Sequence, residues 1–287
     1  MVKSCAFVAL LYGDQPEFLV GARLLGHCLR HWCPNIRTRI LLLARDSSFV
    51  NKKTLRGLKH FWKVRIVTPI VMPNATRTRR HAFAFTKLHA LSVDARRVLF
   101  LDLDVLVLSR IVAELFDINA PAGLYHGRDD SACDLHHGNI INSECLTGAC
   151  VNTGILRVDP ADTRKKRNEM IKDLKERAGR ITKTQATFLP ENYFLTEALP
   201  GPWRHISPEW NWEVGPEIEI APHHVRVHTV GEWAEIDPTD IVVFHFFGIR
   251  CKPWSYIDLS TDEVEQCLRQ RFGWQDTHGR IAQVVSE

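Results

Sequence analysis

Apolar runs alternate with helical patterns along the first part of the chain. Residues 5–11 form a continuous apolar run, which is typical of a strand buried on both faces. Residues 17–30 repeat apolar side chains at helical spacing, and a second helical pattern spans residues 50–61 between segments at 37–43 and 63–67 that we interpret as strands. This order of strand, helix, strand, helix and strand predicts a parallel sheet covered by helices.

The later elements are spaced more widely. We expect further helices at 85–93, 110–116, 160–177 and 261–272, and further strands at 97–101, 155–158 and 242–247. Residues 126–150 are rich in loop-forming residues, and residues 200–240 show no clear period. Because no internal repeat or linker separates these elements, the pattern predicts one α/β domain over residues 1–287.

Composition narrows the functional classes. Hydrophobic residues make up 45% of the chain and charged residues 24%, which allows a large core and excludes wholesale disorder. A net charge of +4 gives no reason to expect a nucleic-acid-binding protein. The sequence has no apolar run of about 18 residues, so we expect no transmembrane helix, and its first residues lack the layout of a signal peptide.

The eight cysteines form no Cys-x-x-Cys pair. We interpret them as reduced thiols of a cytosolic or nuclear protein, because disulfide bonds are rare in those compartments. Cys28 and Cys33 lie near His27 and His31, but their spacing fits no standard zinc module. We therefore favour small buried thiols at a helix end over a zinc site.

Two carboxylates follow the strand predicted at 97–101. In extended chain, Asp102 and Asp104 point to the same side, and Leu103 points to the other. Ligands bind at the carboxyl ends of parallel strands, and two close carboxylates repel each other unless a cation lies between them. The pair therefore indicates either an Mg²⁺ or Mn²⁺ site or two solvated acids at a strand end.

The last predicted strand adds three candidate residues. His245 lies in an apolar stretch, so it is either a core histidine or a nitrogen ligand, and nitrogen favours Mn²⁺ over Mg²⁺. Gly248 permits a close backbone approach to a ligand. Lys252 is either a point charge for a phosphate or an ordinary exposed lysine.

Taken in order, these segments resemble glycosyltransferase family 8, and most closely its glycogenin-like members. The resemblance rests on residues 6–8, 85–89, 100–104, 152–154, 210–212 and 245–254. It implies a GT-A fold, with a mostly parallel, Rossmann-like nucleotide-binding sheet flanked by helices. It also divides the single domain into a nucleotide-binding half at 1–105, an acceptor and sugar half at 106–260, and a C-terminal helix and tail at 261–287.

The resemblance further implies a retaining transferase that moves galactose or glucose from a UDP-sugar. Asp102, Asp104 and His245 would hold Mn²⁺, with Mg²⁺ as the alternative. Lys87 and Lys252 would assist the leaving diphosphate. The remaining residues would contact the donor: Leu10, Leu11 and Tyr12 at the uridine, Leu103 and Gly248 beside the metal, and Asn152, Thr153, Gly154, Glu191 and Asn192 at the sugar.

Two departures from the family pattern stand out. Three residues separate Gly248 from Lys252, where the family usually has two, so Arg250 is an alternative to Lys252. Glu191 and Asn192 stand where the family has an Asp-Gln pair, which affects the choice of sugar.

The acceptor is inferred from an absence. Glycogenin glucosylates its own tyrosine between the segments that correspond to 210–212 and 245–254, and no tyrosine lies between Tyr193 and Tyr256 here. The chain also ends soon after Trp254, so we expect no long tail that docks glycogen synthase. We therefore predict a separate acceptor, either a small molecule or a glycan on a cytosolic protein. The profile is similar to cytoplasmic protist transferases that cap a glycan on a ubiquitin-ligase adaptor.

Several alternatives stay open. A non-catalytic nucleotide-sugar-binding protein and a glycogenin-type glucan primer are the main ones, whereas a sugar nucleotidyltransferase would need a Gly-rich loop after the first strand. Trp203, Trp210 and Trp212 are either an acceptor-sugar platform or core residues. We expect a cytoplasmic protein without a nucleic-acid or membrane partner. Dimers are common in the family, so a homodimer is also among the expectations.

Overall fold

The computed structural model of the protein describes residues 4–13, 15–45, 47, 50–71, 83–125, 136–146, 150–181, 190–214, 240–246 and 252. The helix expected at 261–272, the residue Gly248 and the alternative residue Arg250 lie outside these ranges.

A seven-stranded sheet forms the centre of the described chain, in the order β3-β2-β1-β4-β7-β6-β8. Its strands are β1 (Cys5–Leu11), β2 (Arg39–Ala44), β3 (Lys63–Val67), β4 (Arg97–Leu101), β6 (Ala122–Tyr125), β7 (Val151–Val158) and β8 (Arg204–His205). The first four strands are parallel, β7 is antiparallel to β4 and β6, and β8 is parallel to β6. The mostly parallel sheet predicted from the sequence is confirmed.

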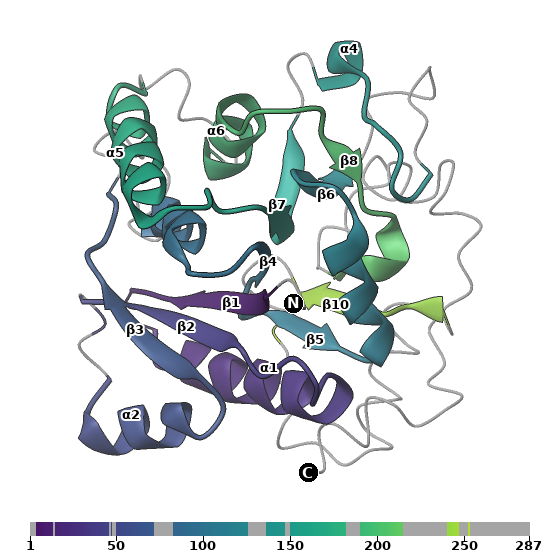
Figure 1. The fold of residues 1–287 in the computed structure, drawn as a ribbon. Helices are drawn as coiled ribbons and strands as arrows, with labels where there is room; N and C mark the ends of the chain where they lie inside the picture. Colours follow the sequence, from purple (N-terminus) through teal and green to yellow (C-terminus); the bar gives the residue numbers. More distant parts are fainter. Residues whose placement is uncertain are drawn as a thin grey trace.

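Helices cover both faces of this sheet (Figure 1). On one face lie α1 (Phe18–Trp32) and α2 (Lys52–Lys59), and on the other lie α5 (Arg164–Gly179), α6 (Pro190–Ala198) and the 3₁₀ helix η1 (Phe85–Ser92). The short elements are α4 (Ser143–Leu146) and the 3₁₀ helices η2 (Arg110–Asp117) and η3 (Pro208–Trp210). No helix in the described part of the chain has the length and hydropathy needed to cross a membrane.

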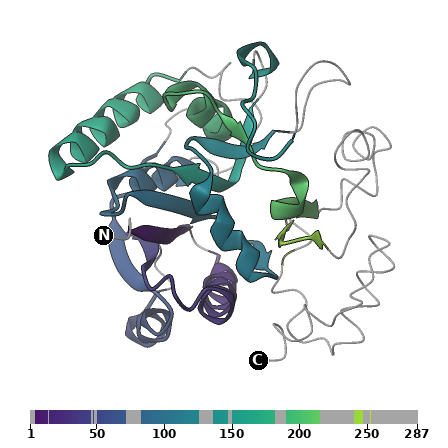
Figure 2. The same ribbon diagram turned by 45° about the vertical axis from the view of Figure 1, so that its right-hand side comes forward.

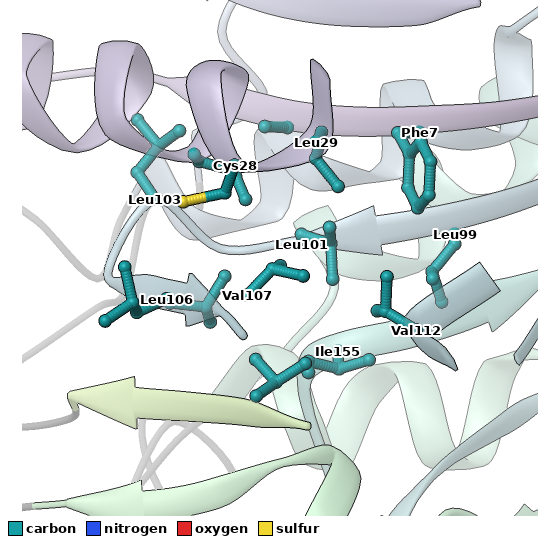
Figure 3. Close-up of a cluster of buried hydrophobic side chains, with 14 of the residues drawn as sticks. Phe7, Cys28, Leu29, Leu99, Leu101, Leu103, Leu106, Val107, Val112 and Ile155 are labelled. Carbon is teal, nitrogen blue, oxygen red and sulfur yellow. The ribbon is translucent and has the colours of Figure 1, made fainter. Parts of the chain in front are cut away.

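The alternation of side chains along β1 explains the two layers. Phe7 and Leu11 belong to the core cluster that contains the α1 and α2 side chains, whereas Val8 and Leu10 belong to the cluster under η1, α5 and α6. Figure 3 shows Phe7 beside Leu29 of α1, with the β4 residues close by. Each such side chain stabilises the fold by about 1.5–3 kcal/mol when it is fully buried.

A second sheet of three short strands lies beside the first. Its order is β5-β10-β9, with β5 at Val105–Val107, β9 at Trp212–Val214 and β10 at Val243–Phe246. β10 is antiparallel to β5 and parallel to β9. Figure 2 shows the green segment with β9 next to the yellow-green β10. Since β5 follows β4 directly, residues 102–104 connect the two sheets.

The sequence predicted the long elements better than the short ones. The strands at 5–11, 63–67 and 97–101 were placed correctly, whereas the strand expected at 155–158 begins earlier, at Val151. The helices expected at 85–93 and 110–116 are present, and both are 3₁₀ helices. Strands β5, β6, β8 and β9 were missed, because two to four residues carry too little periodicity.

The structure also bears on the expectations for the cysteines and for the tryptophans. Cys145 is disulfide-bonded, so the prediction of eight reduced thiols is wrong at that position. Trp203 and Trp210 are buried, and the Trp203 indole donates to the Thr196 carbonyl (2.9 Å). These two tryptophans are therefore core residues and not an acceptor-sugar platform.

Candidate active site

The connection between β4 and β5 brings the two aspartates to the junction of both sheets. The Asp102 amide donates to the Gly154 carbonyl of β7 (2.8 Å), and the Asp104 carbonyl accepts from the Phe246 amide of β10 (2.8 Å). β4 ends at Leu101, and Leu103 and Asp104 form a turn. The expected extended conformation of 102–104 is therefore wrong. Leu103, expected beside the metal as a donor contact, is buried in the core cluster that contains α1 side chains (Figure 3).

Asp102, Asp104 and His245, the metal ligands expected from the sequence, lie close enough together to hold one metal ion, and we call this group the metal-binding cluster. Each offers one ligand atom, and these atoms lie within 4.8 Å of one another. Among the residues that the structure describes, no other group of three or more His, Cys, Asp or Glu side chains meets this condition, so the zinc alternative at Cys28 and Cys33 has no support. Asp104 and His245 are buried, whereas the Asp102 side chain is 32% exposed. Asp102 therefore lies on the open side of the cluster.

Each aspartate has its own lysine. The Lys87 ammonium lies 3.6 Å from Asp102 Oδ1 and donates to Thr153 Oγ1 (3.2 Å). The Lys252 ammonium donates to Asp104 Oδ2 and to the Phe246 carbonyl (2.7 Å). Lys252 therefore reaches the site despite the extra residue that precedes it.

Burial raises the pKa of Asp102 above its usual value. Lys87 opposes this shift, Asp104 adds to it, His245 opposes it, and Glu191 adds to it. The neighbouring positive groups therefore do not fully offset the cost of burying the charged carboxylate of Asp102. An additional cation at the cluster would stabilise that charged form.

Hydrogen bonds set the orientation of the His245 ring. Its Nδ1 lies 3.0 Å from Asn211 Oδ1, and Asn211 Nδ2 donates to Asn152 Oδ1 (3.3 Å). Because the Asn211 amide oxygen faces the ring, the hydrogen-bond pattern assigns the proton to Nδ1. The lone pair on Nε2 then faces Asp104 Oδ1 at 3.7 Å. A second residue that fixes the ring and tautomer in this way is typical of histidine metal ligands.

Gly154 makes room for this ring. A Cβ at Gly154 would lie only 2.2 Å from His245 Cε1, closer than any real Cβ contact. Its amide donates to Asn152 Oδ1 (2.8 Å), and Asn152 Nδ2 donates to Glu213 Oε1. Asn152 and Gly154, expected to contact the sugar, therefore support the metal-binding cluster.

Sequence reasoning assigned no role to Asn211 or Glu213. The signal was present in the Trp210-Asn211-Trp212 segment, because a polar amide between two large aromatic residues indicates a buried hydrogen-bonding group. Both side chains are buried.

The sequence model of glycosyl transferase family 8 matches residues 63–258, more than half of the chain. The chain belongs to glycosyl transferase family 8. This match includes the aspartate pair, Gly154 and His245. No curated protein sequence matches the chain.

Solved structures of glycosyltransferases share this family 8 fold. The galactosyltransferase LgtC in complex with donor and acceptor sugar analogues has a TM-score of 0.60 at 15% identity, over 98% of this chain and 95% of that one. GlyE of Streptococcus pneumoniae has a TM-score of 0.53 at 14% identity, over 87% and 56% of the two chains. The bifunctional transferase WbbM has a TM-score of 0.54 at 15% identity, over 88% and 47%. The predicted GT-A fold is confirmed.

Two other predicted donor-site residues of this family 8 chain lie on α6. Asn192 is buried, and its Oδ1 accepts a hydrogen bond from Thr153 Oγ1. Glu191 is only partly buried, but its Oε2 atom is enclosed and has no hydrogen-bond partner among the described residues. Of the pair, Glu191 therefore retains a free acceptor.

The residues expected at the uridine lie at the end of β1. The Leu10 and Leu11 side chains are buried in the two core clusters, so any contact with a nucleotide would use their backbone. Tyr12 is half-buried directly after the strand. The role expected of Gly248 lies outside the described residues.

A divalent cation fits the metal-binding cluster. Two carboxylate oxygens and one imidazole nitrogen suit Mn²⁺, and Mg²⁺ accepts the oxygens as well. The ammonium of Lys252 already rests on Asp104, so positive charge is stabilised there.

Proposed function

We propose that the protein is a retaining hexosyltransferase, which transfers galactose or glucose from a UDP-sugar to a separate acceptor and depends on Mn²⁺. The observation that carries this proposal is the metal-binding cluster of Asp102, Asp104 and His245, with its ring oriented by Asn211. Membership of family 8 supports the reaction class.

In this proposal Asp102, Asp104 and His245 hold the cation. When bound, the cation neutralises the negative charge that grows on the leaving UDP. Mg²⁺ is the alternative metal, because it accepts the same carboxylate oxygens.

The two lysines are the proposed electrostatic catalysts. Lys87 lies over the ring of Phe100 (5.3 Å) and beside Asp102, which holds its ammonium at the open side of the cluster. Lys252 is buried between Asp104 and the Phe246 carbonyl. Fixed positive charges beside the diphosphate stabilise the leaving group without any reorganisation during the reaction.

The donor sugar is the proposed partner of Glu191. Its free carboxylate oxygen is a hydrogen-bond acceptor for a sugar hydroxyl. Asn192 would act indirectly. Its Oδ1 accepts a hydrogen bond from the Thr153 hydroxyl, and that hydroxyl oxygen accepts one from the Lys87 ammonium. Leu10, Leu11 and Tyr12 remain the proposed contacts of the uridine.

The narrower proposals concern the acceptor, the location and the assembly. We propose a glycan or small-molecule acceptor, a glycogenin-like subgroup close to the protist transferases, one catalytic domain, and a homodimer. The cytoplasmic location is also a proposal, and the disulfide bond of Cys145 counts against it, since such bonds are rare in the cytosol. Thiol titration of the unfolded protein, purified from its own cells under alkylating conditions, tests this point.

The decisive experiment measures UDP release from a panel of UDP-sugars without acceptor. The proposal predicts slow release from one hexose donor with Mn²⁺, none with chelator, and none in Asp104→Asn. Asp173→Asn is the matched control, because Asp173 is an exposed residue of α5 that pairs with Arg177 (3.8 Å). If the protein binds UDP but releases none from any donor, either alone or when glycan acceptors are added, the result would favour the non-catalytic nucleotide-sugar-binding protein.

Self-glycosylation is tested separately by mass spectrometry of the intact protein after incubation with donor. The proposal predicts no added hexose on its tyrosines, because none lies between Tyr193 and Tyr256. A ladder of added hexoses would instead identify a glycogenin-type primer.

A further inference from the structure

A cleft of about 380 Å³ lies between β3, η1 and α5, and it contains none of the residues of the metal-binding cluster. Its polar lining comes from three elements: Arg65 of β3, His89 and Ser92 of η1, and Asn168, Lys172, Lys175 and Glu176 of α5. We call it the cationic cleft. Its volume lies within the range of about 300–1,000 Å³ that small-molecule sites occupy.

The charges of the cationic cleft do not balance. Glu176 is its one carboxylate and lies 4.0 Å from Lys172, one helical turn away. Arg65 and Lys175 have no carboxylate partner within the described residues. Lys165 and Arg177 of α5 differ in this respect, since each pairs with an acid of the same helix.

The protein holds two of these groups in place. Arg65 Nη1 donates to the Ser92 carbonyl (3.1 Å), and burial followed by repulsion from Arg164 and Arg167 lowers the pKa of Arg65. His89 is buried, with Nε2 hydrogen-bonded to the Thr68 carbonyl (2.9 Å). Its Nδ1 has no hydrogen-bond partner in the part of the chain that the structure describes. Since Nε2 donates to that carbonyl, Nδ1 of the neutral ring is an acceptor, and Arg65 is the fixed donor that this pair offers to an anion.

We propose that the cationic cleft binds a phosphate group carried on a small molecule. The planar guanidinium of Arg65 offers paired donors to phosphate oxygens, and the Lys175 ammonium adds a point charge. Arg65 of β3 and Lys172 and Lys175 of α5 outnumber the single carboxylate Glu176, and this excess of positive charge matches a dianion better than the single charge of a carboxylate. η1 supplies Lys87 to the active site and His89 to the cleft, so one element serves both sites.

The test uses metal-free protein without nucleotide sugar, so it is independent of the proposed transferase activity. Inorganic phosphate and glucose 6-phosphate are titrated by calorimetry against chloride and acetate at equal ionic strength. We expect saturable phosphate binding that the combined substitutions Arg65→Gln and Lys175→Gln weaken by at least roughly tenfold, since charge-assisted hydrogen bonds are lost. Lys175→Gln alone, at a partly buried position with no carboxylate partner among the described residues, provides a second variant that leaves Arg65 in place.

Lys165→Gln combined with Lys166→Gln is the matched control. Like the test variant it removes two positive charges, here both from α5, at exposed residues outside the cationic cleft. Tighter binding of glucose 6-phosphate than of inorganic phosphate supports a phosphate ester as the ligand, and equal binding supports inorganic phosphate. Equal weakening in the control variant, or a response to phosphate no larger than that to chloride or acetate, overturns the proposal.

Discussion

The candidate active site and the cationic cleft both gather charged groups from several elements, but they balance charge differently. In the active site each aspartate meets a lysine, and His245 meets Asn211. In the cationic cleft Arg65 and Lys175 lack an acidic partner among the described residues. Buried charges need partners because their desolvation is costly, whereas exposed charges are screened by water and ions. The same chain therefore pairs charges where they are buried and leaves them unpaired at a surface cleft.

The largest effect is expected where this buried pairing is broken. In Asp104→Asn the Lys252 ammonium loses its carboxylate while it stays buried. We expect the free energy of unfolding to fall by about 3 kcal/mol and Mn²⁺ binding to be lost. Urea unfolding and Mn²⁺ titration followed by electron paramagnetic resonance measure both quantities. Asp173→Asn, the exposed control on α5, should change stability by less than about 1 kcal/mol. Unchanged Mn²⁺ affinity in Asp104→Asn would contradict the assignment of Asp104 as a ligand.

A methyl group at Gly154 tests the packing beneath the same cluster. The Cβ of Gly154→Ala would overlap His245 Cε1 at 2.2 Å, so the ring must move away from Asp104. We expect Mn²⁺ affinity to fall by roughly tenfold or more and stability to fall by about 1–3 kcal/mol. Gly179→Ala is the matched control, because nothing lies within 4 Å of its Cβ position. An alanine at Gly154 that leaves Mn²⁺ affinity intact would show that His245 is not a ligand.

Substitution of Asn211 separates ring orientation from the ligand itself. In Asn211→Leu the His245 Nδ1 proton loses its acceptor, so either ring nitrogen can carry the proton. We expect Mn²⁺ affinity to fall by about 10–100-fold, as for other residues that orient metal ligands. Asn211→Asp keeps an acceptor at this position and should restore most of the affinity. The visible spectrum of the Co²⁺-substituted protein should change in the leucine variant and return in the aspartate variant. Equal losses in both variants would point to a packing role for Asn211.

The smallest effect is expected at His89 of the cationic cleft. Burial lowers its pKa below 6.5, the Thr68 hydrogen bond opposes the shift, and Lys175 and Arg65 add to it. The unfolded chain therefore takes up a proton near pH 6.5 that the folded chain takes up only at lower pH. Stability from this group is complete above pH 6.5 and is lost as the pH falls through the folded pKa.

His89→Gln should reduce the loss of stability between about pH 7.5 and about pH 5.5, because glutamine does not titrate. Glutamine also keeps an N–H donor for the Thr68 carbonyl. Urea unfolding at about pH 7.5 and about pH 5.5 measures the difference between the two proteins. The slope will not vanish, because burial also lowers the pKa of His137. His31→Gln, at an exposed position on α1, is the control. A slope that is the same in His89→Gln and in the unsubstituted protein would mean that His89 is charged in the fold.

The sequence alone was sufficient to predict the layered half of the fold and to select the three residues that form the candidate metal site. Largely apolar runs predicted β1 and β4 with correct bounds, because strands buried on both faces need apolar residues at nearly every position. The bounds of β3 were also correct, although only Val67 of that strand is fully buried. We could select Asp102, Asp104 and His245 because charged or titratable residues are uncommon in apolar strands. The two aspartates directly follow such a strand, and His245 lies within one. The aspartates follow a predicted strand directly, so their proximity needed no tertiary information.

Only the tertiary structure decided how these residues are supported. Gly154 looked like a sugar contact, and its role in admitting the His245 ring depends on β7 and β10 lying together, which no local pattern encodes. Asn211 and Glu213 lie in a segment that shows no hydrophobic period. Lys87 pairs with Asp102, and Lys252 with Asp104, only because η1 and the second sheet pack against these aspartates. Arg65 and Lys175, far apart in sequence, share a cleft for the same reason. Periodicity is a property of neighbours along the chain, whereas charge pairing and close approach depend on segments that only folding brings together.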